Sequence, residues 1–85
     1  MRCDNLPIQV IVHYTAAGAM QPLRFQFEDQ RKLAHTVRID QVMDSREVEA
    51  PDSEVILYRC RSGDHWYELK YLVRFHKWIL FRQIC

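Results

Sequence analysis

The chain has 85 residues and a formal net charge of +1, from 12 lysines and arginines against 11 acidic side chains. A hydrophobic fraction of 48%, with two glycines and three prolines, excludes intrinsic disorder, collagen-like repeats and flexible linkers. The near-neutral charge indicates no polyanionic partner, and no apolar run reaches the roughly 18 residues that span a bilayer. We expect one soluble, cytoplasmic β domain over residues 1–85, frayed from Met1 to Leu6 and without a membrane partner.

Apolar and polar side chains alternate in the first half of the chain, the pattern of half-buried strands. The alternation runs from Ile8 to Thr15 and again over residues 23–27. Pro22 fits the first position of the second strand, where no ladder donor is lost. A third alternating stretch begins at Leu33 and predicts a strand to about Val42.

The middle of the chain is acidic. Residues 40–54 carry six acidic side chains against one basic side chain, Arg46, and also contain a proline. This composition predicts a solvated acidic loop at about residues 43–53, or a frayed continuation of the third strand toward Val48. The following residues 54–61 start apolar on both faces, which is typical of a central strand.

Residues 64–82 decide the fold, because they admit either one helix or two strands. On a helix, the charged side chains of this segment scatter around the whole circumference and leave no apolar stripe. At a period of two, the odd positions from Tyr67 to Phe75 are all apolar and the even positions are mostly polar. The period predicts a strand, a turn near residues 74–77 and a final strand over residues 78–84.

These elements predict an all-β domain made of a single antiparallel meander of five to six strands. With so few residues, the sheet must curl to bury its aromatic side chains. It does so either as a strongly coiled sheet or as a small closed barrel, SH3-like or similar.

No pattern of a P-loop, dinucleotide fold, nucleophile elbow or zinc protease occurs in the sequence. The cysteines lack C-x-x-C spacing, which favours free thiols over a disulfide scaffold or a zinc site. We expect exposed histidines at His13 and His76, and hydrogen-bonded histidines at the core edge at His35 and His65. No enzyme activity, cofactor or metal site is expected. The three cysteines are Cys3, Cys60 and Cys85.

The carboxy-terminal third combines cations with aromatic rings. Residues 55–85 hold six basic side chains against two acidic ones. This mixture suits single-stranded nucleic acid, whose bases stack on rings while cations neutralise phosphates; it also suits a protein-binding patch or the two faces of an ordinary small sheet. On strands, Lys70 and Arg74 would share a face with Trp66, and Trp78 would share one with Arg82. The candidate binding face comprises Arg59, Arg61, Trp66, Lys70, Arg74, Lys77, Trp78 and Arg82.

Five short segments occur in a distinctive order along the chain: PLRFQFED (residues 22–29), VRID (37–40), LYRC (57–60), WYELKY (66–71) and KWILF (77–81). This order resembles a family of short uncharacterised bacterial proteins of clostridia and their relatives. It is also distantly similar to small β domains beside or fused to DNA-damage-bypass polymerases, although the middle of this chain lacks their dense tryptophan and arginine content. The resemblance covers about residues 7–82 and implies a cytoplasmic all-β protein in DNA-repair surroundings, without catalytic residues to transfer.

The sequence leaves two functions open. The first is a non-enzymatic β module that binds a protein partner, or a second copy of itself, through an unpaired sheet edge. The alternative is a nucleic-acid-binding module that uses the basic and aromatic face of residues 55–85, in a DNA-repair context. The positions of Trp66 and Trp78 discriminate between the two, because rings that both point into the core leave no stacking platform.

Overall fold

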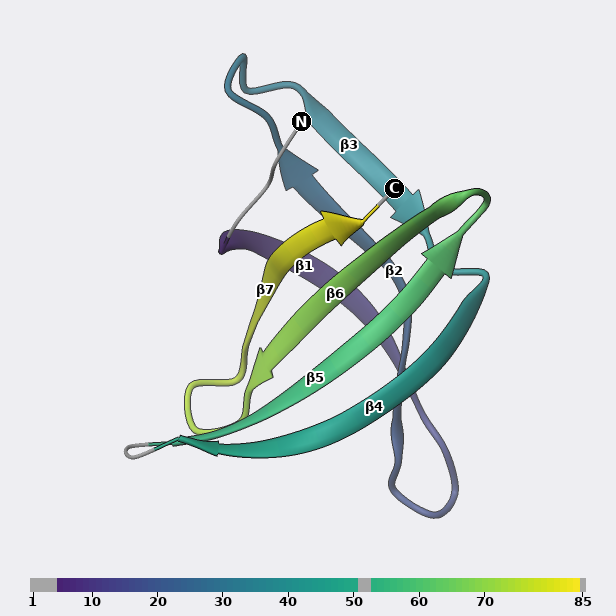
Figure 1. Ribbon diagram of the computed structural model, residues 1–85, viewed down its shortest axis with the longest axis vertical. Helices are drawn as coiled ribbons and strands as arrows, with labels where there is room; N and C mark the ends of the chain where they lie inside the picture. Colours follow the sequence, from purple (N-terminus) through teal and green to yellow (C-terminus); the bar gives the residue numbers. More distant parts are fainter. Residues whose placement is uncertain (1–4, 51–52, 85) are drawn as a thin grey trace.

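The computed structural model describes residues 5–50 and 53–84, which form one sheet of seven antiparallel strands (Figure 1). The all-β prediction is confirmed, and residues 64–82 form strands rather than a helix. The predicted count of five to six strands is too low. The strands are β1 (Leu6–Tyr14), β2 (Met20–Glu28), β3 (Ala34–Arg38), β4 (Gln41–Ala50), β5 (Ser53–Ser62), β6 (His65–Leu72) and β7 (Lys77–Ile84).

Strand β4 occupies most of the segment predicted as an acidic loop over residues 43–53, so the loop prediction is wrong for residues 43–50. Its register with β5 is continuous from Asp44, opposite Arg59, to Ala50, opposite Ser53. Every side chain from residue 43 to residue 49 is exposed, so the charges keep their hydration while the backbone pairs. A high charge content therefore does not prevent this strand from forming.

The starts of the first two strands differ from the predictions. Residues 1–4 of the segment expected to fray lie outside the described residues, and Leu6 already begins β1. Pro22 lies in the third position of β2, not the first. It is tolerated there because the register with β1 shifts at this point, leaving Leu23 as a bulge between the pairs of Pro22 and Arg24.

The strand order is β3-β2-β1-β7-β6-β5-β4, so every strand pairs with its neighbours in sequence except β3 with β4. Strand β1 changes partner along its length: residues 6–8 pair with β7, and residues 9–14 pair with β2. A meander whose first and last strands pair is an up-and-down barrel opened at one place. The sheet is accordingly a curled half-barrel, and closure as a small barrel is not observed.

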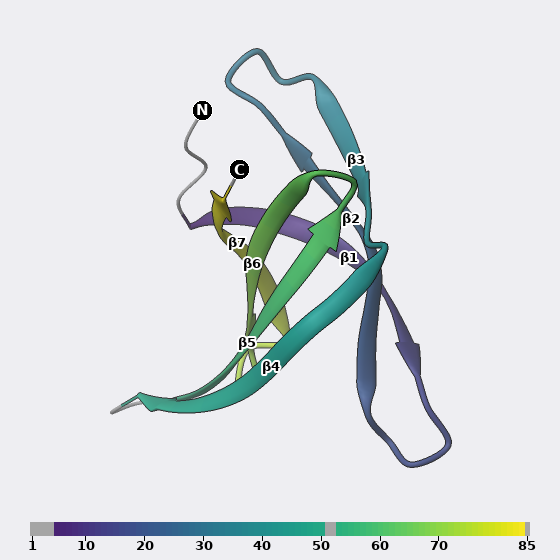
Figure 2. The same ribbon diagram turned by 45° about the vertical axis from the view of Figure 1, so that its right-hand side comes forward.

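The chain turns from one half of the sheet to the other at Ile39 and Asp40. The amide of Ile39 donates to the carbonyl of Leu23 at 2.9 Å, and the amide of Asp40 donates to the carbonyl of Arg61 at 2.8 Å. Ile39 thus bonds to the half of the sheet formed by β1–β3, and the next residue, Asp40, bonds to the half formed by β4–β7. From this corner the β1–β2 and β4–β5 hairpins point apart (Figure 2).

The core lies on the concave side of the curl. Phe25 of β2 meets Tyr67 of β6 edge-on, with ring centroids 5.3 Å apart, and so joins the two halves. Burying a ring of this size contributes about 2 kcal/mol from the hydrophobic effect. The buried hydrophobic side chains are Phe25, Tyr58, Cys60, Tyr67, Leu69 and Leu80.

Candidate binding surfaces

The register divides the candidate residues between two faces of the sheet. Tyr67 and Leu69 lie in the core, so the alternate residues of β6 face away from it. Directly opposed residues of antiparallel strands share a side. We call the side of β5, β6 and β7 that faces away from the core the outer face. It carries the predicted residues Arg59, Arg61, Trp66, Lys70, Lys77 and Arg82.

Two predicted residues lie elsewhere. Arg74 belongs to the turn between β6 and β7. Trp78 packs against the core, with its ring centroid 5.3 Å from that of Tyr58 and 4.9 Å from that of Tyr71. The structure therefore places Trp66 on the outer face and Trp78 inside.

The prediction that Trp78 shares a face with Arg82 is wrong because β7 contains a bulge. Arg82 lies opposite Glu68, but Leu80 lies opposite Leu69, which leaves Phe81 as the extra residue. One inserted residue reverses the alternation. Arg82 thus faces outward although Trp78 faces inward.

Glu68 is buried at the centre of the outer face, between two arginines. It accepts a hydrogen bond from Arg82 Nε and a longer one, 3.5 Å, from Arg59 Nη2. Burial acts to raise the pKa of Glu68, but the hydrogen bonds and charges of Arg82 and Arg59 together hold that pKa below its ordinary value. One carboxylate thus pairs with two of the predicted cations and leaves the trio with a net charge of +1. The sequence signal for this trio is Glu68 itself, the single acid among the polar positions of β6.

Two further cations of the outer face, Lys70 and Arg61, also have partners, whereas Lys77 is exposed. Lys70 Nζ lies 4.0 Å from the ring centroid of Phe81, a cation–π contact. Arg61 donates to the carbonyl of Gly63 at 3.3 Å and to Gln41 Oε1 at 3.5 Å. Trp66 lies opposite Arg61 in the register. This face therefore offers a half-buried ring among cations that are largely engaged within the protein.

Sequence reasoning missed the open edge of β4. This strand pairs with β5 on one side, and within residues 5–50 and 53–84 no strand pairs with its other side. A pocket of about 400 Å³ lies beside it, between the β1–β2 hairpin and the β4–β5 hairpin. Its lining residues are Gly18, Ala19, Met20, Ser45, Arg46, Glu47, Ile56 and Tyr58. The alternation of acidic and apolar residues in Glu47–Val48–Glu49–Ala50 is the signal that predicts a strand here.

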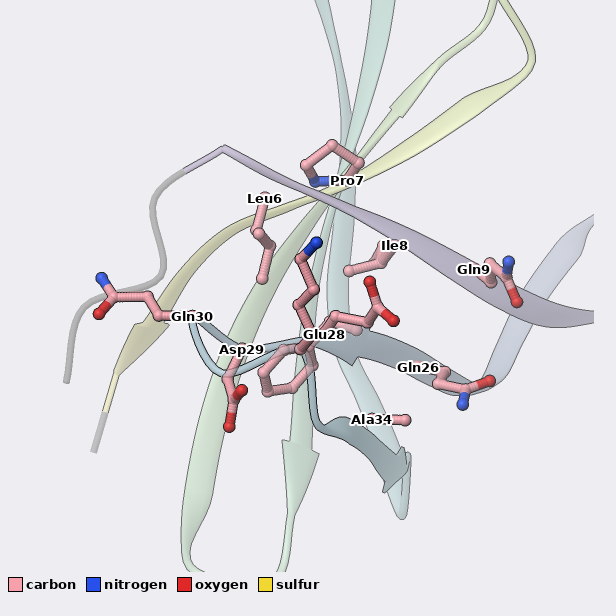
Figure 3. A pocket seen from close by; sticks show the side chains of 11 residues that line it. Leu6, Pro7, Ile8, Gln9, Gln26, Glu28, Asp29, Gln30 and Ala34 are labelled. Carbon is pink, nitrogen blue, oxygen red and sulfur yellow. The ribbon is translucent and has the colours of Figure 1, made fainter.

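A second pocket, of about 570 Å³, lies where β1 leaves β2 to pair with β7. Leu6 of β1 and Glu28 of β2 extend into the gap, whereas Asp29 points away from β1 (Figure 3). Asp29 is occupied with its own turn: Oδ1 accepts the amides of Arg31 and Leu33, at 2.8 and 3.0 Å. This pocket therefore lacks a pair of carboxylates poised for acid–base chemistry.

The histidines form no shared site. His13 and His76 are exposed, as predicted. His35 and His65 have hydrogen-bond partners, Asp29 at 2.7 Å and Gln83 at 3.5 Å, but both are exposed rather than buried at the core edge. Among the described residues, no three His, Cys, Asp or Glu side chains are grouped to hold a metal ion.

None of the described residues belongs to a helix long and apolar enough to cross a membrane. In comparisons with known proteins, no family model, no curated protein and no solved structure matches the chain. The resemblance of the five segments to clostridial proteins stays a prediction. The function is therefore argued from the geometry of the two surfaces.

Proposed function

We propose that this protein is a non-enzymatic, cytoplasmic binding module that captures an extended segment of a protein partner along β4. The observation that carries the proposal is the ten-residue β4 strand, which is paired with β5 and open on its other side in the described structure. Unpaired amides and carbonyls along a strand are a template for another chain. Strand addition of this kind takes affinity from main-chain hydrogen bonds and specificity from alternate side chains.

The charge of β4 favours a partner over a second copy of this chain. The strand carries Asp44, Glu47 and Glu49 against the single cation Arg46. Two copies paired along β4 would bring their carboxylates together, and like charges opposite each other destabilise a strand pair. The same charges protect an exposed edge from self-association.

Peptide selection combined with hydrogen exchange tests the proposal. Random peptides of about 12 residues, long enough to cover β4, are selected on the immobilised protein. We expect a bound peptide to slow amide exchange along β4, with no change along β3, which is the matched open edge. We also expect a version of the peptide with N-methyl groups at alternate residues to lose binding. Selection of no peptide, or binding without protection of β4, would overturn strand addition.

Single-stranded nucleic acid is a second candidate because Trp66 and Lys70 share the outer face. An aromatic ring beside a cation supports base stacking with phosphate neutralisation. The inward position of Trp78 and the pairing of Arg59 and Arg82 with Glu68 leave this candidate less support than strand addition.

Fluorescence anisotropy with labelled single-stranded oligonucleotides tests this second candidate. If the outer face binds nucleic acid, binding weakens with salt and is lost in Trp66→Ala and Lys70→Glu variants. The absence of binding at low salt eliminates it.

A further inference from the structure

We infer that the strand received by β4 is basic, with Lys or Arg at alternate positions, and that it lies in the seam between β4 and the β1–β2 hairpin. The inference rests on the strand addition proposed above and specifies the chemistry of the partner. The seam is defined by β4 on one side and by residues 18–23, from the turn and the start of β2, on the other.

The register places three carboxylates on the concave side of the β4–β5 hairpin. Ile56 packs against the core, so Glu47, directly opposite, faces the same side. Glu49 follows two residues later on that side and lies opposite Glu54. Burial raises the pKa of Tyr58, and the charge of Glu47 adds a smaller contribution in the same direction.

These three carboxylates are exposed and unneutralised. None of the ion pairs formed within residues 5–50 and 53–84 involves them. Glu49 and Glu54 are directly opposed, an arrangement that destabilises an antiparallel pair. Arg46, the one cation of β4, lies opposite Leu57 and therefore on the other side. An added cation on the concave side would relieve this repulsion.

The seam has room for such a strand. The pocket of about 400 Å³ lies within it. Strand β3 begins to pair with β2 only at Arg24, so residues 20–22 form a second open edge in the described structure. Tyr14 lies opposite Met20, whose side chain packs against the core, and Tyr14 is 63% exposed. This ring can stack on a cation that enters the seam.

Alternation then limits the requirement for cations to every second residue. Concave-side residues of an added strand would meet Glu47 and Glu49, whereas the residues between them would meet the mixed side of Asp44, Arg46 and Val48. The partner segment that fits is therefore an extended strand with cations on the concave side only. A uniformly basic tail would gain nothing from its outward cations.

The test uses the selected peptides on wild-type protein and on two charge-reversed variants. Glu47→Lys/Glu49→Lys alters the seam, and Glu28→Lys/Asp64→Lys makes the same change in net charge at exposed acids elsewhere. We expect basic residues at alternate positions of the selected peptides. We also expect an affinity loss of about tenfold or more in the seam variant, and of less than about twofold in the control. Circular dichroism confirms folding, and Glu47→Gln/Glu49→Gln replaces the seam variant if Glu47→Lys/Glu49→Lys fails to fold.

The outcomes separate the two proposals. Equal affinity for a selected peptide and its acidic counterpart overturns the inference, whereas strand addition stands if both peptides are lost on N-methylation. Basic peptides that still bind after N-methylation overturn strand addition and the inference together. A stable dimer of the unbound protein in sedimentation, broken by the seam variant, also overturns both, because the edge would then be occupied by a second copy.

Discussion

At the scale of single residues, Cys60 is a thiol without access to solvent. Its side chain is fully buried, and burial raises its pKa to about 12. Thiolate, the reactive form, is therefore negligible at neutral pH. In a Cys3→Ser/Cys85→Ser variant, we predict that a disulfide reagent modifies Cys60 only as fast as the protein unfolds. Spectrophotometric thiol titration with and without denaturant measures this, and complete reaction of the native protein within seconds would contradict it.

Glu68 is the residue whose loss most affects the outer face. Glu68→Gln leaves Arg59 and Arg82 without their shared counter-charge, and we predict a loss of about 1–3 kcal/mol in the free energy of unfolding. Urea denaturation at pH 7 measures it. The exposed Glu28→Gln is the control and should be nearly neutral.

The difference in unfolding free energy between wild type and Glu68→Gln is also predicted to depend on pH. The folded-state pKa of Glu68 is lowered, so its stabilisation is fully present above the ordinary value of about 4.3 and is lost as the pH falls through the folded value. The stability gap between wild type and Glu68→Gln should therefore shrink as the pH falls below about 4.3 into the acid range. An unchanged gap across that range would show that the charge of Glu68 is not what stabilises the face.

At the scale of elements, the β2–β3 hairpin depends on the carboxylate of Asp29. Hydrogen bonding to His35, followed by bonding to the Leu33 amide, lowers the pKa of Asp29. We predict that Asp29→Ala accelerates amide exchange along β3 and leaves β5–β6 unchanged, because β3 pairs only with β2 in the described structure. Gln30→Ala, in the same turn, is the control. Uniform acceleration over all strands would mean that the turn contributes to global stability instead.

The elements also show where hydrophobic alternation is a sufficient guide. Strands β1 and β2 bury one face, and β6 directs Tyr67, Leu69 and Tyr71 to the core, so apolar residues recur at every second position and can be recognised in the sequence. Strand β4 is exposed on both sides from Met43 to Glu49, so no buried face imposes the pattern, and the alternation is limited to residues 47–50. Its strand conformation comes from pairing with β5. The many acidic residues and the proline of this segment led to the wrong prediction of a loop.

At the scale of the whole molecule, Phe25 joins the β1–β3 half to the β4–β7 half across the core, in addition to the pairing of β1 with β7. We predict that Phe25→Ala costs about 3–5 kcal/mol, because it removes a fully buried ring that contacts Tyr67 across the core. The loss should appear equally in tryptophan fluorescence, which reports on β6 and β7, and in amide exchange of β2. Leu23→Ala, at a 45% exposed position, should cost less than about 1 kcal/mol. Separate transitions for the two halves would show that they unfold independently.

Much of the architecture was determined by the sequence alone: the all-β class, the strands on either side of the turn after Leu72, and several of the aromatic residues that pack against the core. These follow from side-chain periodicity, which is local information. Only the tertiary structure decided that β1 pairs with β7, that β3 and β4 stay apart, and that Phe81 bulges so that Trp78 faces inward while Arg82 meets Glu68. These features depend on register between residues distant in the chain, and a shift of one residue exchanges the two faces of a strand without altering its composition.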